Sequence, residues 1–291
     1  MVSERELKDI ISQVLREMGT EGKIEEKIAE KVEERVAESD LVDITKIDFR
    51  EVIDVKNPAN EAELLKYKRK TPARVGIGRA GCRYRTNTML RFRADHASAV
   101  DAVYTDVSED FLKANNLFTV KTRCNSKDEY ITRPDLGRRL DEESVAILKE
   151  KVKKSSKVQV FVADGLSSTA IEKNIEDTLP ALLNGLKSYG IETGTPFFLK
   201  YGRVGAADEV SEIVDAEVTC VLIGERPGLA TAESMSAYIT YRGYIGIAEA
   251  KRTVVSNIHK NGTPAAEAGA HIAHIIKKIL EAKASGQDLK L

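Results

Sequence analysis

The sequence has few cysteines and no long apolar run. Its three cysteines, Cys82, Cys124 and Cys220, are odd in number and far apart, which argues against a disulfide framework and a CxxC metal site. No apolar stretch approaches the length of a membrane span, and the N-terminus, charged from Glu4 onward, has no secretory apolar core. We therefore expect a reducing, cytoplasmic setting and no membrane segment.

The chain also lacks an excess of charge of either sign. Its 45 basic and 46 acidic residues leave a formal net charge of −1. Proteins that bind nucleic acid or anionic membranes usually present a basic field, so we expect no nucleic-acid partner. The length of 291 residues, 42% of them hydrophobic, is enough for a sizeable core and indicates two domains or one domain with a long extension.

Familiar catalytic patterns are missing as well. There is no G-x-S-x-G elbow and no Walker loop. A formal GxGxxG at 76–81 follows the charged stretch 67–74 rather than a buried strand, which argues against a dinucleotide fingerprint. His271 and His274 lie three apart on a predicted helix, and we favour a surface pair over a metal site. We therefore expect neither catalytic residues nor a metal site in this chain.

The N-terminal region carries two helical patterns. In the first, within 1–19, apolar residues recur at helical spacing before Gly19 ends the run; they are Leu7, Ile10, Ile11, Val14, Leu15 and Met18. This amphipathic helix either docks on its own core or is detachable and binds a partner groove. Residues 20–70 are predicted to form a charged helical extension or linker.

Residues 71–155 are rich in arginine around the start of a helix predicted from Thr86. The arginines concerned are Arg79, Arg83, Arg85, Arg91 and Arg93. Arginine is enriched in interfaces and binds carboxylates in a forked geometry, so we interpret 71–155 as a mainly helical subunit-interface domain. The alternative is a solvated basic face.

From residue 157 the pattern alternates between strands and helices. Apolar runs predict strands at 158–163, 196–201, 218–223 and 236–241. Helical periodicity predicts helices that end near 189 and that cover 208–214, 246–255 and 264–284. This order is typical of right-handed βαβ units, so we expect an α/β fold with a parallel sheet over 156–291.

Three of these strands end in loops with polar residues. Asp164 and Ser167 follow the first, Arg203 follows the second, and Glu225 and Arg226 follow the third. The carboxyl ends of parallel strands meet at one edge, where open α/β sheets bind ligands. We interpret Asp164 as a cap of the helix after it. The edge therefore favours binding of a polar-rimmed ligand over bond breaking.

Eight motifs in a fixed order carry a resemblance to a known family. From about residue 73 to the C-terminus they read VGIGRAG, LRFRADHASAVDAV, RPDLGRRL, VADGLS, YGRV, GERPGL, RTVVSNIH and NGTPAAEA. This set resembles the small (light) subunit of adenosylcobalamin-dependent ethanolamine ammonia-lyase. The resemblance implies a heteromeric lyase that converts ethanolamine to acetaldehyde and ammonia by radical chemistry. The large subunit, a TIM barrel, would carry the substrate and most catalytic residues.

For this chain, the resemblance implies a Rossmann-like cobalamin-binding domain over 156–291. The family's cofactor contacts fall on Val204, Glu225 and Val254, with Arg203 as a neighbour. Family members used for comparison have cysteine at position 254, and valine keeps the volume but loses the thiol. The sequence lacks Asp-x-His-x-x-Gly, the motif that gives cobalt a protein histidine. We therefore expect base-on adenosylcobalamin, with its own dimethylbenzimidazole on cobalt.

The resemblance also indicates partners. We expect the large subunit as the main one. The family is associated with bacterial microcompartments for ethanolamine utilisation, so we expect residues 1–19 to bind shell protein. Two alternatives stay open. The chain is a stand-alone α/β enzyme that binds nucleotide or phosphate at the same edge, or a structural assembly subunit without ligand contact.

Overall fold

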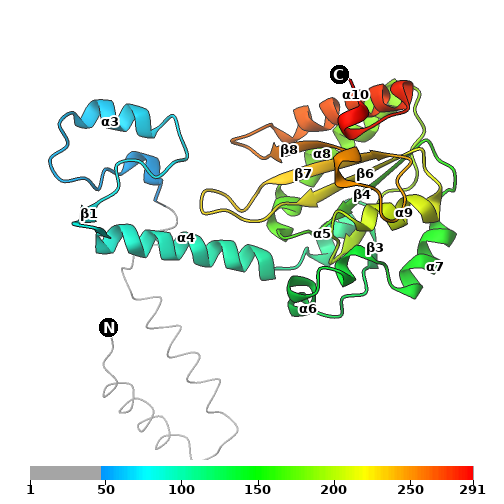
Figure 1. The fold of residues 1–291 in the computed structure, drawn as a ribbon, viewed down its shortest axis with the longest axis horizontal. Coiled ribbons are helices and arrows are strands. Elements are labelled where there is room, and N and C mark those ends of the chain that lie inside the picture. Colours follow the sequence, from blue (N-terminus) through cyan, green and yellow to red (C-terminus); the bar gives the residue numbers. More distant parts are fainter. Residues whose placement is uncertain (1–46, 291) are drawn as a thin grey trace, which may run out of the picture. The chain divides into compact units, whose positions relative to one another are not determined.

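The computed structural model describes residues 47–290, and the described residues from Arg50 onward belong to one structural unit (Figure 1). The predicted helix within 1–19 and the charged segment as far as residue 46 lie outside the described residues. None of the helices in the described part is long and apolar enough to cross a membrane.

One six-stranded sheet organises this unit. Its order is β3 (Phe118–Lys121), β5 (Phe197–Lys200), β4 (Val158–Ala163), β6 (Val218–Gly224), β7 (Met235–Tyr241) and β8 (Arg252–Ile258). The first four strands in this order are parallel, and β7 and β8 run antiparallel to their neighbours. Every residue of β4 and β6 is buried, as expected for strands covered on both faces. The predicted α/β class with a parallel sheet is confirmed, and the observed sheet is mostly parallel.

Helices cover both faces of the sheet (Figure 1). On one face, α8 (Ser168–Ser188) and α10 (Ala265–Ala282) pack on the sheet through one apolar cluster. On the other face, α7 (Glu142–Lys151) and α9 (Ala206–Val214) form a second cluster, which we call the α9-side core. The sheet is therefore enclosed, and its strand ends are left as the accessible edge.

The segment before residue 156 is mainly helical, but it contributes an edge strand to the sheet. Its elements are η2 (Phe49–Glu51), α3 (Glu61–Lys68), β1 (Arg79–Ala80), β2 (Arg83–Tyr84), α4 (Thr86–Tyr104), α5 (Glu109–Ala114), β3, α6 (Lys127–Thr132), η3 (Leu136–Arg138) and α7. The short strand β3 pairs in parallel with β5. The sheet therefore begins earlier in the chain than residue 156.

The helix predicted over 246–255 is wrong. The chain forms a short 3-10 turn, η4 (Glu249–Lys251), and then strand β8. Backbone pairing with β7 and the buried Arg252–Asp208 ion pair at 3.0 Å outweigh the local helical pattern. A further 3-10 turn, η5 (Gly286–Asp288), follows α10.

The strands β7 and β8 are the antiparallel part of this sheet. Parallel neighbours need a crossover of a dozen or more residues, usually with a helix. The link from β6 to β7 spans only residues 225–234 and contains no helix, so β7 turns back along β6. The loop after β6 is therefore the tip of a hairpin.

Candidate functional site

The loops after β4 and β6 touch at the carboxyl edge of the sheet. Gly224 ends β6 so close to the β4 loop that a Cβ there would lie 2.2 Å from the Ser167 carbonyl oxygen. The same Cβ would lie 2.5 Å from the Asp164 carbonyl oxygen. The Leu166 amide donates a hydrogen bond of 3.1 Å to the Gly224 carbonyl. Since β5 is the other neighbour of β4, the three loops share one edge, as parallel strands require.

Asp164 joins the β4 loop to the β5 loop. Its carboxylate is buried and accepts hydrogen bonds from the amides of Tyr201 at 2.8 Å and Gly202 at 2.9 Å. Burial raises the pKa of Asp164 to about 6, against the lowering effects of Lys127 and these two amides. The prediction that Asp164 caps the following helix is wrong, because Ser167 accepts from the Ala170 amide and caps α8 instead.

The bonds from Asp164 stabilise an unusual backbone conformation. Tyr201 has φ of 59°, which non-glycine residues seldom adopt. Gly202 follows, and after it come Arg203 and Val204, two of the four predicted cofactor-binding residues. Asp164 therefore fixes the shape of the loop that carries them.

Arg203 is engaged with the segment around Tyr130. Its Nη2 donates to the Tyr130 carbonyl at 2.7 Å, and the guanidinium carbon lies 4.3 Å from the centre of the Tyr130 ring. The Arg203 amide donates to the Gly137 carbonyl at 2.9 Å. Within the described residues, its buried Nε has no hydrogen-bond partner. Val204, just before α9, is half-buried and packs against the α9-side core.

Glu225 and Val254 are both linked to Tyr238 on β7. The Tyr238 hydroxyl donates to Glu225 Oε1 at 3.1 Å, and Tyr238 is the direct cross-strand partner of Val254. Tyr238 also packs against the α9-side core, as Val204 does. Val254 leaves 46% of its surface exposed. Two of the predicted residues, Glu225 and Val254, are therefore direct neighbours of a tyrosine that the sequence does not single out, and Val204 packs against the same core cluster.

The only signal for Tyr238 in the sequence is weak. It lies within the predicted strand 236–241, but a tyrosine in a strand is usually explained by packing. The pairing of Tyr238 with Val254 cannot be foreseen from the sequence, because helical periodicity predicts a helix at Val254. No sequence pattern marked the register that places the two opposite each other.

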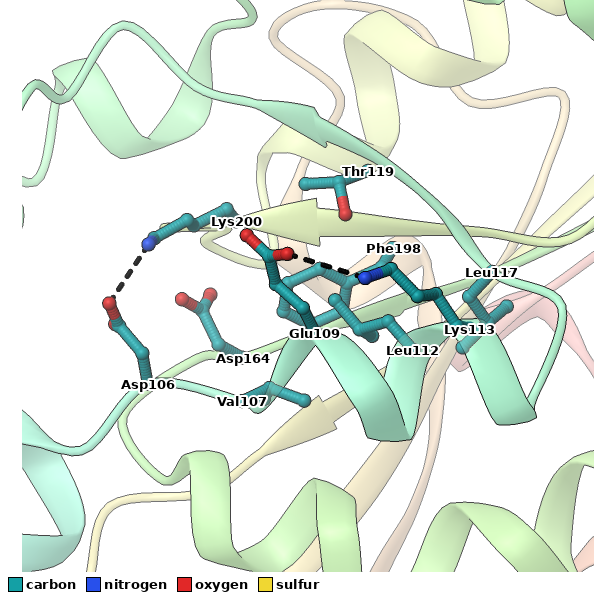
Figure 2. A pocket seen from close by; sticks show the side chains of 10 residues that line it. All are labelled: Asp106, Val107, Glu109, Leu112, Lys113, Leu117, Thr119, Asp164, Phe198 and Lys200. Carbon is teal, nitrogen blue, oxygen red and sulfur yellow. Dashed lines mark hydrogen bonds and ion pairs between the residues drawn. The ribbon is translucent and has the colours of Figure 1, made fainter.

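A cavity of about 310 Å³ lies on the opposite side of the sheet from the α9-side core. Its apolar wall belongs to the cluster under α8 and α10, with Val107, Leu112, Leu117 and Phe198 (Figure 2). Its charged rim is internally paired, Asp106 with Lys200 at 2.8 Å and Glu109 with Lys113 at 3.6 Å. Asp164 also borders it. The predicted cofactor residues do not line this cavity.

The described residues contain no group of three or more His, Cys, Asp or Glu that could hold a metal ion. His271 and His274 are exposed on α10. His259 is buried, with Nε2 at 2.8 Å from Asn257 Oδ1 and Nδ1 accepting from the Asn261 amide. Both of its ring nitrogens are therefore occupied.

Comparison with known proteins assigns the family. The profile of the family described as ethanolamine ammonia-lyase light chain (EutC) matches residues 61–290. Proteins named ethanolamine ammonia-lyase small subunit are similar along the whole chain. The one from Fusobacterium nucleatum is 72% identical over 296 residues, covering 100% of both chains. Those from Clostridium tetani and Clostridioides difficile are 57% and 53% identical, covering 100% and 99% of this chain and 100% of each relative. The chain therefore belongs to the ethanolamine ammonia-lyase light-chain family, and its function is that of the small subunit of this carbon–nitrogen lyase.

Proposed function

We propose that the edge formed by the β5 and β6 loops and by β8 contacts adenosylcobalamin in a complex with the large subunit. The contacts of Glu225 and Val254 with Tyr238, and the packing of Val204 against the same core cluster as Tyr238, support this proposal. The complex would convert ethanolamine to acetaldehyde and ammonia. When bound, adenosylcobalamin supplies homolysis of its Co–C bond, which begins the radical chemistry.

The residues at this edge fit the chemistry of a large amide-rimmed cofactor. Glu225 is partly exposed and offers a carboxylate that accepts hydrogen bonds from amide groups. Val254 and Val204 offer apolar contact, and nearly half of the Val254 surface is exposed. Arg203 contributes by holding its loop against Tyr130. This chain's role is therefore to place the cofactor and exclude water from it.

We further propose that the cofactor binds base-on. Both nitrogens of His259 already have partners, and the sequence has no Asp-x-His-x-x-Gly motif. Electron spin resonance of the cob(II)alamin state, in enzyme with ¹⁵N-histidine, is expected to show no coupling to a protein nitrogen. A protein ¹⁵N coupling would disprove the base-on assignment.

The test of the site is Glu225→Ala in the complex with the large subunit. Losing one charged acceptor is expected to weaken cobalamin binding by about 1–3 kcal/mol, with assembly intact. The matched control is Glu233→Ala in the same loop, because Glu233 pairs with Lys260 at 3.3 Å. Unchanged affinity in Glu225→Ala would favour the purely structural subunit. Nucleotide binding by this chain alone would favour the stand-alone enzyme.

We also propose that segment 71–155 contacts the large subunit. Some of its arginines form ion pairs within this chain: Arg85 with Asp54 at 3.0 Å, and Arg91 with Asp95 at 2.9 Å. Helix α4 nevertheless exposes four large apolar side chains, Met89, Leu90, Val100 and Tyr104. Exposed apolar groups of this kind support an interface. Charge reversal at Arg93, an exposed position on α4, is expected to weaken assembly, and an unchanged complex would argue against this interface.

Residues 1–19 are proposed to bind microcompartment shell protein. The proposal rests on the amphipathic pattern alone, because these residues lie outside the described part of the chain. A helix of this length is marginal by itself in water and needs a groove for its apolar stripe. The alternative is that the stripe packs on its own subunit.

A further inference from the structure

We propose that Tyr238 is a positioning residue of the cofactor site, which holds the Glu225 carboxylate in the orientation that binds the cofactor. This inference rests on the proposed function. It adds a residue outside the set indicated by the resemblance, and it assigns that residue a role through Glu225 rather than through direct contact.

The geometry places Tyr238 between two strands that carry predicted cofactor residues. On one side it pairs with Val221 of β6, the strand that leads to Glu225. On the other side it pairs with Val254 of β8. Directly opposed residues of antiparallel strands point to the same face, so these three side chains share the α9 side of the sheet. The Tyr238 ring therefore lies on the face of the sheet where Val204 also packs.

Glu225 is held at two points. Its amide donates to the Ser234 carbonyl at 2.9 Å, which closes the hairpin at the backbone. Its Oε1 accepts from the Tyr238 hydroxyl at 3.1 Å. Among the described residues, its Oε2 has no hydrogen-bond partner. The side chain thus has one oxygen that is anchored to the sheet and a second oxygen that is available to a ligand.

The direction of the Tyr238–Glu225 bond is fixed by the chemistry of both groups. Burial raises the pKa of Tyr238 to about 12, and the charge of Glu225 adds to this effect. The phenol therefore stays protonated and donates near neutral pH. An ionised carboxylate only accepts, so the pair presents a negative, pre-oriented acceptor. Ordering a flexible side chain on binding weakens affinity, and Tyr238 removes that cost because it orders Glu225 before the cofactor binds.

The test is Tyr238→Phe in the complex with the large subunit, with adenosylcobalamin titrated by its visible spectrum. Phenylalanine keeps the ring between Val221 and Val254 and removes only the hydroxyl. Affinity is expected to fall about 3- to 10-fold, the equivalent of one ordered side chain. The matched control is Tyr241→Phe on the same strand, because Tyr241 packs against the opposite core cluster. That variant is expected to bind like the parent.

A double-mutant cycle separates positioning from a general structural role. In a Glu225→Ala background, Tyr238→Phe is expected to have no further effect on affinity, because the group it positions is gone. In a Glu225→Gln background an acceptor oxygen remains, so Tyr238→Phe is expected to weaken binding again. A structural role would lower affinity equally in all three backgrounds.

The outcomes distinguish this inference from the proposed function. If Glu225→Ala weakens binding and Tyr238→Phe does not, the positioning role is wrong and the cofactor site stands. An equal loss for Tyr238→Phe in the Glu225→Ala background also overturns the role. If Glu225→Ala itself leaves affinity unchanged, the proposed site and the positioning role both fail.

Discussion

Gly224→Ala tests whether close approach of two loops holds the carboxyl edge together. Gly224 does not have a positive φ, so the test concerns space alone. The new Cβ would lie 2.2 Å and 2.5 Å from two carbonyl oxygens of the β4 loop. Both obstacles are backbone atoms, which cannot rotate away as the end of a side chain does. The loops must therefore separate by about 1 Å to reach ordinary contact.

The cost of that separation follows from two contributions. Overpacking in a close-packed region costs about 1–3 kcal/mol, and backbone on both sides puts this case at the upper end. The same movement stretches the bond from the Leu166 amide to the Gly224 carbonyl, which contributes about 1 kcal/mol. Alanine also restricts the conformations of the unfolded chain, which stabilises the folded protein by about 0.4–1 kcal/mol. The free energy of unfolding is expected to fall by about 3 kcal/mol.

Thermal and urea unfolding measure this change. For a unit of this size, about 3 kcal/mol corresponds to a fall in Tm of about 6–12 °C. The matched control is Gly228→Ala in the same loop, because the nearest atom to a Cβ there lies 3.8 Å away. That variant is expected to unfold within about 1 kcal/mol of the parent. A Gly224→Ala protein that melts within about 2 °C of Gly228→Ala would refute the argument from close approach.

Two further predictions concern pH and the N-terminus. Folding raises the pKa of Asp164 to about 6. The protonated side chain therefore stabilises the folded protein below the pKa of the unfolded chain, and this stabilisation is lost as the pH rises through 6. Between about pH 4 and 6 this group makes the free energy of unfolding fall by up to about 1.4 kcal/mol per unit. Asp164→Asn is expected to lack that component in urea titrations, and an identical slope would contradict it. Deleting 1–19 is expected to leave turnover and Tm unchanged and to abolish co-localisation with shells. A large fall in Tm with localisation retained would show instead that the apolar stripe of 1–19 packs in the core of its own subunit.

The parts of the fold that were predictable are those where local pattern and burial agree. The strands β4 and β6 are continuous apolar runs because helices cover both their faces. The helix α8 has a wide apolar face and a serine cap. Each of these features is written in one short stretch of sequence.

The parts that were missed depend on partners far along the chain. The strand β3 has only four residues, two of them exposed, and it is a strand because β5 lies beside it. The strand β8 exposes Val254 and buries Arg252, which reverses the usual pattern, because Asp208 of α9 pairs with the guanidinium. The candidate site was found through resemblance, but its centre at Tyr238 depends on the register of β7 with β8, which no local pattern encodes.

The packing of α10 on α8 has a consequence for synthesis of the chain. Helix α8 ends at Ser188, but α10, which covers its apolar face, ends at Ala282, 94 residues later. At about 5–20 residues per second, a ribosome needs roughly 5–20 s to add that stretch. During this interval the nascent chain carries an uncovered apolar helix and a β4 that waits for β6. We therefore expect the newly made polypeptide to expose apolar surface that chaperones bind until the last helix emerges.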